Sequence, residues 1–182
     1  MNPHTKRIYL DYAASTPVDP GVFDAMEPYF RGKFGNPGSL HSFGQEAIAA
    51  LDVSREAVAK AIGAEFREIV FTGSATEANN LALCGTLRMM RELTQKKVRD
   101  DLRPRIVISA IEHESVLETA RELEKEGAEV VYLPVHKNGV VDLRALEASL
   151  NNHTVLVSVM YANNEIGTIQ PISEIAKIIE DF

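Results

Sequence analysis

The sequence has little that would place the protein in a membrane, on a nucleic acid or outside the cell. No segment approaches the roughly 18 uninterrupted apolar residues of a membrane helix, and the start, MNPHTKRIYLDY, lacks the apolar stretch of a secretory signal. No run of Lys or Arg suggests a nucleic-acid or anionic-membrane surface, and 26 acidic against 19 basic residues give a net charge of −7. We therefore expect a soluble, cytoplasmic protein that binds neither nucleic acid nor a membrane.

Cysteine is almost absent as well. Cys84 is the single cysteine, so the chain can form no internal disulfide. It ends the apolar stretch over residues 81–84, and because free cysteine is among the most buried residue types, we expect a buried helix thiol. A hydrophobic content of 45% over 182 residues is enough for one domain with a sizeable core.

The first third of the chain is predicted to be helical, with one long loop. Asp19 is a good N-cap and Pro20 suits the first helical position, which predicts a helix over residues 20–30. Residues 31–39 hold several Gly, Asn and Pro and predict an ordered loop. Apolar residues at helical spacing then predict a second helix over residues 41–62 with one apolar face.

From residue 68 onward, strand patterns alternate with helix patterns. Strands are predicted over residues 68–72, 106–109, 129–133 and 154–160, with helices over 73–93, 114–127, 142–150 and from about 172. The near-continuous apolar run of residues 154–160 is typical of a strand covered on both faces and predicts the most central strand. This alternation predicts an α/β fold with a parallel sheet.

Ligands bind at the carboxyl ends of parallel strands, so the loops after Thr72, Ser109 and Met160 are the candidate sites. After the first strand, the amides around Ala75 and Thr76 begin a helix beside a hydroxyl, which would suit a phosphate. The pattern Ser74-x-x-Glu77 is also a capping box, which would start a helix without any ligand. Neither a P-loop nor a G-x-G-x-x-G motif is present, which argues against nucleotide binding.

The other two loops also carry polar residues. His113 stands between two glutamates at a strand end, either as a solvated helix start or as a group that transfers protons or stacks on a flat cofactor. Residues 161–167 bring two amides and a carboxylate into a segment that turn formation alone explains. No ligand spacing supports a metal site, and none is predicted.

Five segments in this order resemble the cysteine desulfurases of the class-V aminotransferase family, in their NifS/IscS branch, over essentially the whole chain. They are YLDYAASTP from Tyr9, GNPGSLHSFG from Gly35, FTGSATEANN from Phe71, EHES from Glu112 and YANNEIGTIQPI from Tyr161. The resemblance implies a truncated large domain of the pyridoxal-phosphate-dependent transferase fold (fold type I, like aspartate aminotransferase). It also implies a homodimeric enzyme that converts L-cysteine into L-alanine and an enzyme persulfide for iron-sulfur cluster or thio-cofactor assembly.

The resemblance also implies roles for four residues toward pyridoxal 5'-phosphate. Ala75 and Thr76 would bind its phosphate, and His113 would stack on its ring and assist proton transfer. Asn164 would hydrogen-bond the phenolic oxygen of the ring. Residues 1–35 would pack on a small domain and a partner, and residues 36–182 would form an incomplete cofactor-binding domain.

Other family features do not occur in these residues. The family usually reads Ser-Gly-Ala-Thr where this chain has Gly73-Ser74-Ala75-Thr76. The 182 residues contain no Ser-x-His-Lys segment with the lysine that would form the Schiff base, and Cys84 does not occupy the position of the persulfide cysteine. We therefore expect the chain alone to be inactive and part of a truncated, split or frameshifted enzyme, with a second chain or a sulfur-acceptor protein as partner.

Two further expectations follow from the resemblance. The first predicted strand, over residues 68–72, would have no neighbour, so the isolated chain would be poorly stable. The alternatives to a desulfurase fragment are another class-V enzyme, such as a selenocysteine lyase or a kynureninase-like protein, and a non-catalytic fragment that binds the cofactor or the dimer partner.

Overall fold

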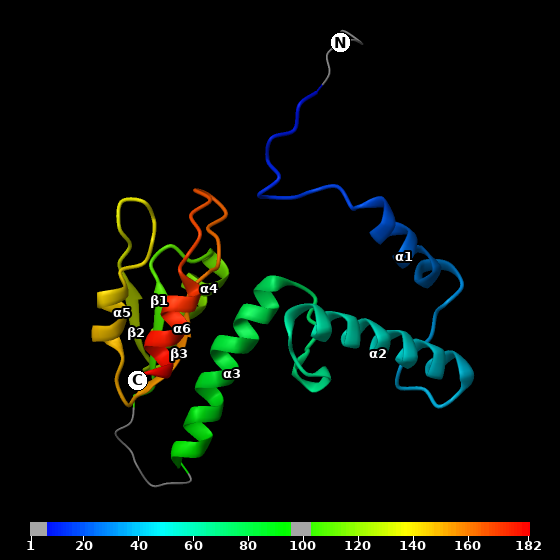
Figure 1. Ribbon diagram of the computed structural model, residues 1–182. Coiled ribbons are helices and arrows are strands. Elements are labelled where there is room, and N and C mark those ends of the chain that lie inside the picture. Colours follow the sequence, from blue (N-terminus) through cyan, green and yellow to red (C-terminus); the bar gives the residue numbers. More distant parts are fainter. Residues whose placement is uncertain (1–6, 96–102) are drawn as a thin grey trace. The chain divides into compact units, whose positions relative to one another are not determined.

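A computed structural model describes residues 7–95 and 103–182 and divides them into two compact units, Met1–Phe71 and Thr72–Phe182 (Figure 1). The predicted division at residue 35 stays a prediction. The elements in chain order are α1 (Pro20–Arg31), α2 (Ser42–Ile62), the 3-10 turn η1 (Phe66–Glu68), α3 (Ala75–Gln95), β1 (Arg105–Ser109), α4 (Glu114–Lys125), β2 (Glu129–Leu133), α5 (Leu143–Ser149), β3 (Thr154–Ser158) and α6 (Ile172–Glu180).

Local signals in the first unit act as predicted. The carboxylate of Asp19 caps α1 by accepting hydrogen bonds from the amides of Gly21 (2.8 Å) and Val22 (3.3 Å). The loop before α2 is tightly folded, since a Cβ on Gly44 would lie 2.1 Å from the carbonyl oxygen of Ser39. A Cβ on Gly35, in the predicted loop, would likewise overlap the carbonyl of Phe43. Only glycine fits at these two positions, which explains part of the glycine content of this region.

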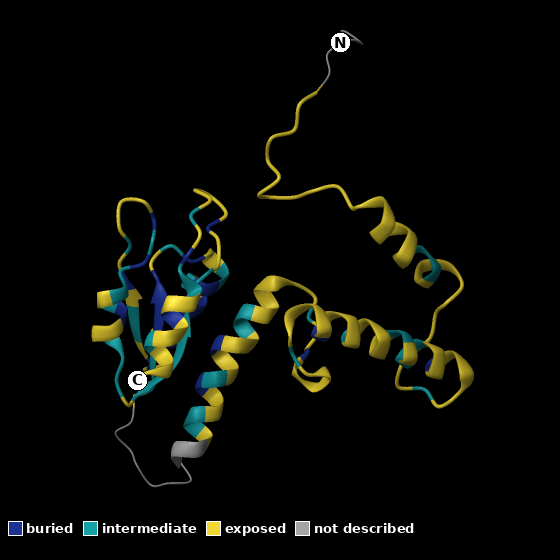
Figure 2. Cartoon of the chain, in the orientation of Figure 1, coloured by how far each residue is buried: buried dark blue, intermediate teal, exposed yellow. Residues whose placement is uncertain are grey.

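The first unit nevertheless buries very little. Within residues 7–71, Gly44, Ala59 and Ile69 are the only buried residues, and Figure 2 shows both helices exposed along most of their length. The predicted apolar face of α2 is formed but uncovered, with Ile62 68% exposed. The helices of this unit are therefore amphipathic without a core to pack on.

The prediction of a strand over residues 68–72 is wrong. Phe66–Glu68 form the 3-10 turn, and Ile69 follows in an extended conformation (φ −89°, ψ 122°), with no strand paired to it in the described chain. The guanidinium of Arg55 donates to the carbonyl of Ile69 instead. An extended segment becomes a strand only through a hydrogen-bonded partner, and none of the described strands pairs with it.

The second unit is built on a parallel sheet with the strand order β2-β1-β3, which confirms the α/β prediction. β1 is therefore the central strand, and the expectation that residues 154–160 form the most central strand is wrong. β3 stops at Ser158, lies at an edge of the described sheet and is only partly buried along its length. An apolar run indicates covered faces and does not specify hydrogen-bonded neighbours.

Alternating side chains of β1 point to opposite faces of the sheet, so a hydrophobic core forms on each face. Ile106 and Ile108 pack with residues of α3 and α4, while Val107 packs on the other face with Leu146 of α5 and Ile175 of α6. All three strand residues are fully buried. This is the period-two alternation of a strand placed between two helical layers.

Cys84 is exposed, contrary to the prediction of a buried thiol. Leu83 and Leu87, four residues apart on α3, point into the core, so Cys84 lies on another side of the helix. Among the described residues, no helix is long and apolar enough to cross a membrane.

Candidate functional site

The turn before α3 contains the predicted capping box. The hydroxyl of Ser74 accepts a hydrogen bond from the amide of Glu77 at 3.1 Å. The carboxylate of Glu77 reaches back to the amide of Gly73 at 2.7 Å, one residue before the N-cap position. The helix start predicted from Ser74-x-x-Glu77 is therefore confirmed.

The capping box leaves the first two helical amides free. The amides of Ala75 and Thr76, and the hydroxyl of Thr76, have no hydrogen-bond partner in residues 7–95 and 103–182. They lie at the positive end of a 21-residue helix. This arrangement fits a phosphate group, because the capping side chains occupy other donors.

His113 is the N-cap of α4, and its ring is held by neighbouring groups. Its Nδ1 accepts from the Ser115 amide (3.1 Å) and lies 2.9 Å from the Ser115 hydroxyl, which itself accepts from the side-chain amide of Asn79 (2.8 Å). Nδ1 therefore acts as an acceptor, and the neutral ring carries its proton on Nε2. Nε2 has no partner within the described parts of the chain and is available to a ligand.

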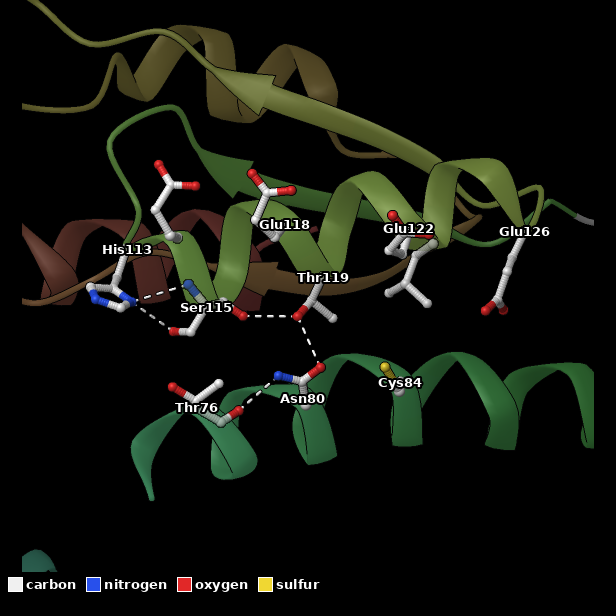
Figure 3. A pocket seen from close by; sticks show the side chains of 11 residues that line it. Thr76, Asn80, Cys84, His113, Ser115, Glu118, Thr119, Glu122 and Glu126 are labelled. Atoms are coloured by element: carbon white, nitrogen blue, oxygen red, sulfur yellow. Dashed lines mark hydrogen bonds between the residues drawn. The ribbon is translucent and has the colours of Figure 1, made fainter. Parts of the chain in front are cut away.

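Thr76 and His113 line one groove of about 510 Å³ between α3 and α4, where Figure 3 shows them at the facing starts of the two helices. The side chain of Asn80 joins the helices, because its amide donates to the Thr76 carbonyl (2.8 Å) and its oxygen accepts from Thr119 (3.0 Å). Cys84 and several glutamates of α4, among them Glu118, line the same groove farther along the two helices.

Asn164 lies in the turn after β3 and does not line this groove in the described structure. The turn is organised by the buried Asn163, whose oxygen accepts from the amides of Glu165 (2.9 Å) and Ile166 (3.0 Å). Gly167 completes it with a left-handed φ of 70°. Turn formation thus accounts for Asn163, while Asn164 is exposed and its amide donates only to Glu165 (3.1 Å).

Several structural residues of the site were missed. Asn79 and Asn80 were not assigned roles, although two asparagines inside a helix are a detectable signal because they are poor helix formers. A solvated helix start was one of the two alternatives for the segment around His113, and for Glu112 it does not hold. Glu112 is 8% exposed and accepts hydrogen bonds from the hydroxyl of Ser109 at the end of β1 and from the amide of Met160 after β3. No sequence pattern identified that burial, because the segments meet only in the folded sheet.

The described residues contain no group of three or more His, Cys, Asp or Glu side chains placed to hold a metal ion.

Comparison with known proteins identifies the family of this chain. The model described as aminotransferase class-V matches residues 8–181. The chain belongs to the class-V aminotransferase family. This family member is 47% identical over its whole length to a protein named cysteine desulfurase IscS from Rickettsia massiliae, of which it covers 42%. It is 48% identical to a mitosomal cysteine desulfurase of Trachipleistophora hominis, with 96% of this chain and 38% of that protein covered.

Solved structures give the same result for the fold. A NifS-like protein superposes with a TM-score of 0.87 at 40% identity, covering 97% of this chain and 46% of the other. A structure described as SspA in complex with cysteine has a TM-score of 0.82 at 36% identity and covers 95% and 47%. The predicted fold and the resemblance to NifS/IscS proteins are confirmed, and the chain spans about two fifths of the length of the curated relatives it matches.

Proposed function

We propose that this chain is the amino-terminal part of a pyridoxal-phosphate-dependent cysteine desulfurase, which takes sulfur from L-cysteine to give L-alanine and an enzyme persulfide. The observation that carries the proposal is the pair of free amides at Ala75 and Thr76, with the Thr76 hydroxyl, in a helix start that faces His113. The names of relatives along the whole chain, and the bound cysteine of one related structure, support the choice of reaction and substrate.

The four predicted residues would divide the binding of the cofactor between them. The amides of Ala75 and Thr76 would hold the phosphate, His113 would stack on the ring, and Asn164 would donate a hydrogen bond to the phenolic oxygen. The bound cofactor supplies the electron-withdrawing ring that such chemistry requires. His113 would exchange protons through Nε2, because its Nδ1 is already engaged by Ser115.

The 182 residues by themselves would not turn over substrate. Their single His-Lys pair, His136-Lys137, follows Pro134 and Val135 and therefore differs from the Ser-x-His-Lys pattern of the family. Lys137 lies between β2 and α5 and is not among the residues that line the groove of Thr76 and His113 in the described structure. A covalent anchor for the cofactor would have to come from other residues.

The intact enzyme would be a cytoplasmic homodimer that passes sulfur to an acceptor or scaffold protein for iron-sulfur cluster or thio-cofactor assembly. A second chain carrying the remaining part of the enzyme would be a further partner. The exposed apolar face of α2 supports the proposal that another polypeptide packs on this chain, because an exposed apolar face of this kind marks a surface that a partner covers. Sedimentation analysis of the chain with and without the remaining part would test it.

Binding of pyridoxamine 5'-phosphate tests the site directly, since its amine cannot form an imine with surface lysines. We expect NMR shifts at the amides of Ala75 and Thr76, and Thr76→Val should weaken binding by about tenfold through loss of one charge-assisted hydrogen bond. Thr86→Val, elsewhere on α3, is the matched control. Unchanged Ala75 and Thr76 amides at saturating ligand would contradict the proposal.

Turnover tests the enzymatic part. With pyridoxal 5'-phosphate and L-cysteine, the chain alone should release no sulfide and no alanine, whereas the chain supplied with the remaining part of the enzyme should release both. Sulfide release by the chain alone would refute the argument from the missing lysine.

A further inference from the structure

Two loops that carry predicted site residues are joined by reciprocal hydrogen bonds. The amide of Met160, just after β3, donates to Oε1 of Glu112 in the β1–α4 loop at 2.6 Å. In the opposite direction, the side-chain amide of Asn163 donates to the carbonyl of Ile111 at 3.0 Å. Each loop thus contributes one side chain and one backbone group, so neither loop can shift without breaking a bond to the other.

A glutamate is an unusual residue to join two loops at a buried position. The residue is 8% exposed, and no Lys, Arg or His in the described parts of the chain forms an ion pair with it. Its Oε1 also accepts from the hydroxyl of Ser109, which is fully buried at the end of β1, at 2.9 Å. A buried carboxylate without a cation is expensive to desolvate, and here its compensation comes from the two donors that meet at Oε1.

We propose that Glu112 is a positioning residue, whose carboxylate fixes the start of α4, and with it His113, relative to the turn that carries Asn164. The inference rests on the proposed function, in which His113 and Asn164 contact the same cofactor ring. His113 is the next residue after Glu112 and caps α4, while Asn164 follows Asn163. The bond from Met160 to Glu112 therefore sets the separation of two groups that lie far apart in sequence.

The test on the ligand-free chain compares three variants. Glu112→Ala removes the acceptor, Glu112→Gln keeps an oxygen at the same place without the charge, and Glu147→Ala removes an exposed glutamate of α5 as the control. We expect Glu112→Ala to speed hydrogen exchange of the Met160 amide about tenfold, the loss of roughly 1.4 kcal/mol of hydrogen bonding. It should also shift the ring nitrogens of His113 and the amide of Asn164, and Glu112→Gln should restore all three signals.

Two results would overturn the inference. One is an unchanged Met160 amide and His113 ring in Glu112→Ala. The other is loss of protection spread equally over α5 and α6, which would mean that Glu112 supports folding alone. Far-ultraviolet circular dichroism and the Glu112→Gln variant separate local displacement from unfolding.

Ligand binding gives a second, independent readout. Glu112→Ala should weaken binding of pyridoxamine 5'-phosphate about tenfold and leave binding of inorganic phosphate at Ala75 and Thr76 unchanged, because only the former contacts both loops. Equal weakening of both ligands would overturn the inference. If the unmodified chain binds neither ligand, the proposed function fails, while the Met160 and His113 signals of the ligand-free chain still decide the role of Glu112.

Discussion

Both units of the chain contain amphipathic helices, but they differ strongly in how many apolar side chains they bury. Residues 7–71 form two well-capped amphipathic helices, yet all but two of the buried apolar residues of the described chain, Ala59 and Ile69, lie in Thr72–Phe182. In the first unit even large aromatic side chains such as Phe30, 75% exposed, remain in contact with solvent. Local signals are sufficient to start and end a helix, but they do not provide a surface for it to pack on.

The second unit differs because its strands find partners within the chain. β1 pairs with β2 and β3, and its alternating side chains bury a layer of helices on each face. The extended residues after η1 have no such partner among the described strands. The presence of paired strands, rather than helix quality, separates the two units.

The largest expected difference between the units is in thermal unfolding. We expect amide signals of residues 7–71 in the purified chain to be lost gradually on heating, because their apolar faces are uncovered, whereas β1 amides persist longest. Residue-resolved NMR over a temperature series measures this. A single cooperative transition shared by α2 and β1 would erase the distinction and would also contradict the expected poor stability of the isolated chain.

The same distinction predicts how truncations of isoleucine behave. Ile106→Ala in β1 should lower the free energy of opening of the sheet by about 2–5 kcal/mol, since it leaves a cavity at a fully buried site. Ile62→Ala in α2, at a site 68% exposed, should change it by less than about 0.5 kcal/mol. Hydrogen exchange of the β1 amides measures both, and equal effects would mean that α2 is packed in solution.

The backbone of the first unit is closely packed at the start of α2. Gly44→Ala should destabilise the start of α2 by about 1–3 kcal/mol, because the new methyl group would overlap the carbonyl of Ser39. Gly32→Ala is the control, since nothing lies within 4 Å of the added Cβ. Exchange of the first α2 amides reports the difference, and similar results for both variants would show that the loop is not tightly folded.

The smallest expected effect is a pH dependence at the start of α5. Hydrogen bonds from the amides of Ala145 and Arg144 lower the pKa of the Asp142 carboxyl in the folded state. Its stabilising contribution is therefore present above the ordinary pKa of aspartate and is lost as the pH falls through the lower folded value. Asp142→Asn, which keeps a capping oxygen, should remove this part of the acid sensitivity of α5, as measured by hydrogen exchange at neutral and acid pH.

Asp24→Asn is the matched control for that experiment. Asp24 lies exposed on α1 and has no hydrogen-bond partner among the described residues, so the acid sensitivity of α5 should not change. An equal response of both variants would show that overall charge, rather than the cap of α5, causes the effect.

Much of the site could be predicted from the sequence because its determinants are local. The capping box of Ser74 and Glu77 lies within four residues, and the helix start that leaves Ala75 and Thr76 free follows from it. The role of His113 as an N-cap is similarly local. The groove that joins Thr76 to His113 was not predictable in this way, because α3 and α4 meet through Asn80 and Thr119, 39 residues apart.

The sequence by itself determined where the helices and three of the four predicted strands begin, which loops carry polar side chains and which family the motifs resemble. Each of these features depends on short stretches of neighbouring residues. Only the tertiary structure decided that β1 rather than β3 is central, that residues 68–72 pair with none of the described strands, that Cys84 is exposed and that Glu112 is buried. Strand pairing and burial are interactions between distant segments. A local pattern can therefore permit them, but it does not choose among the possible partners.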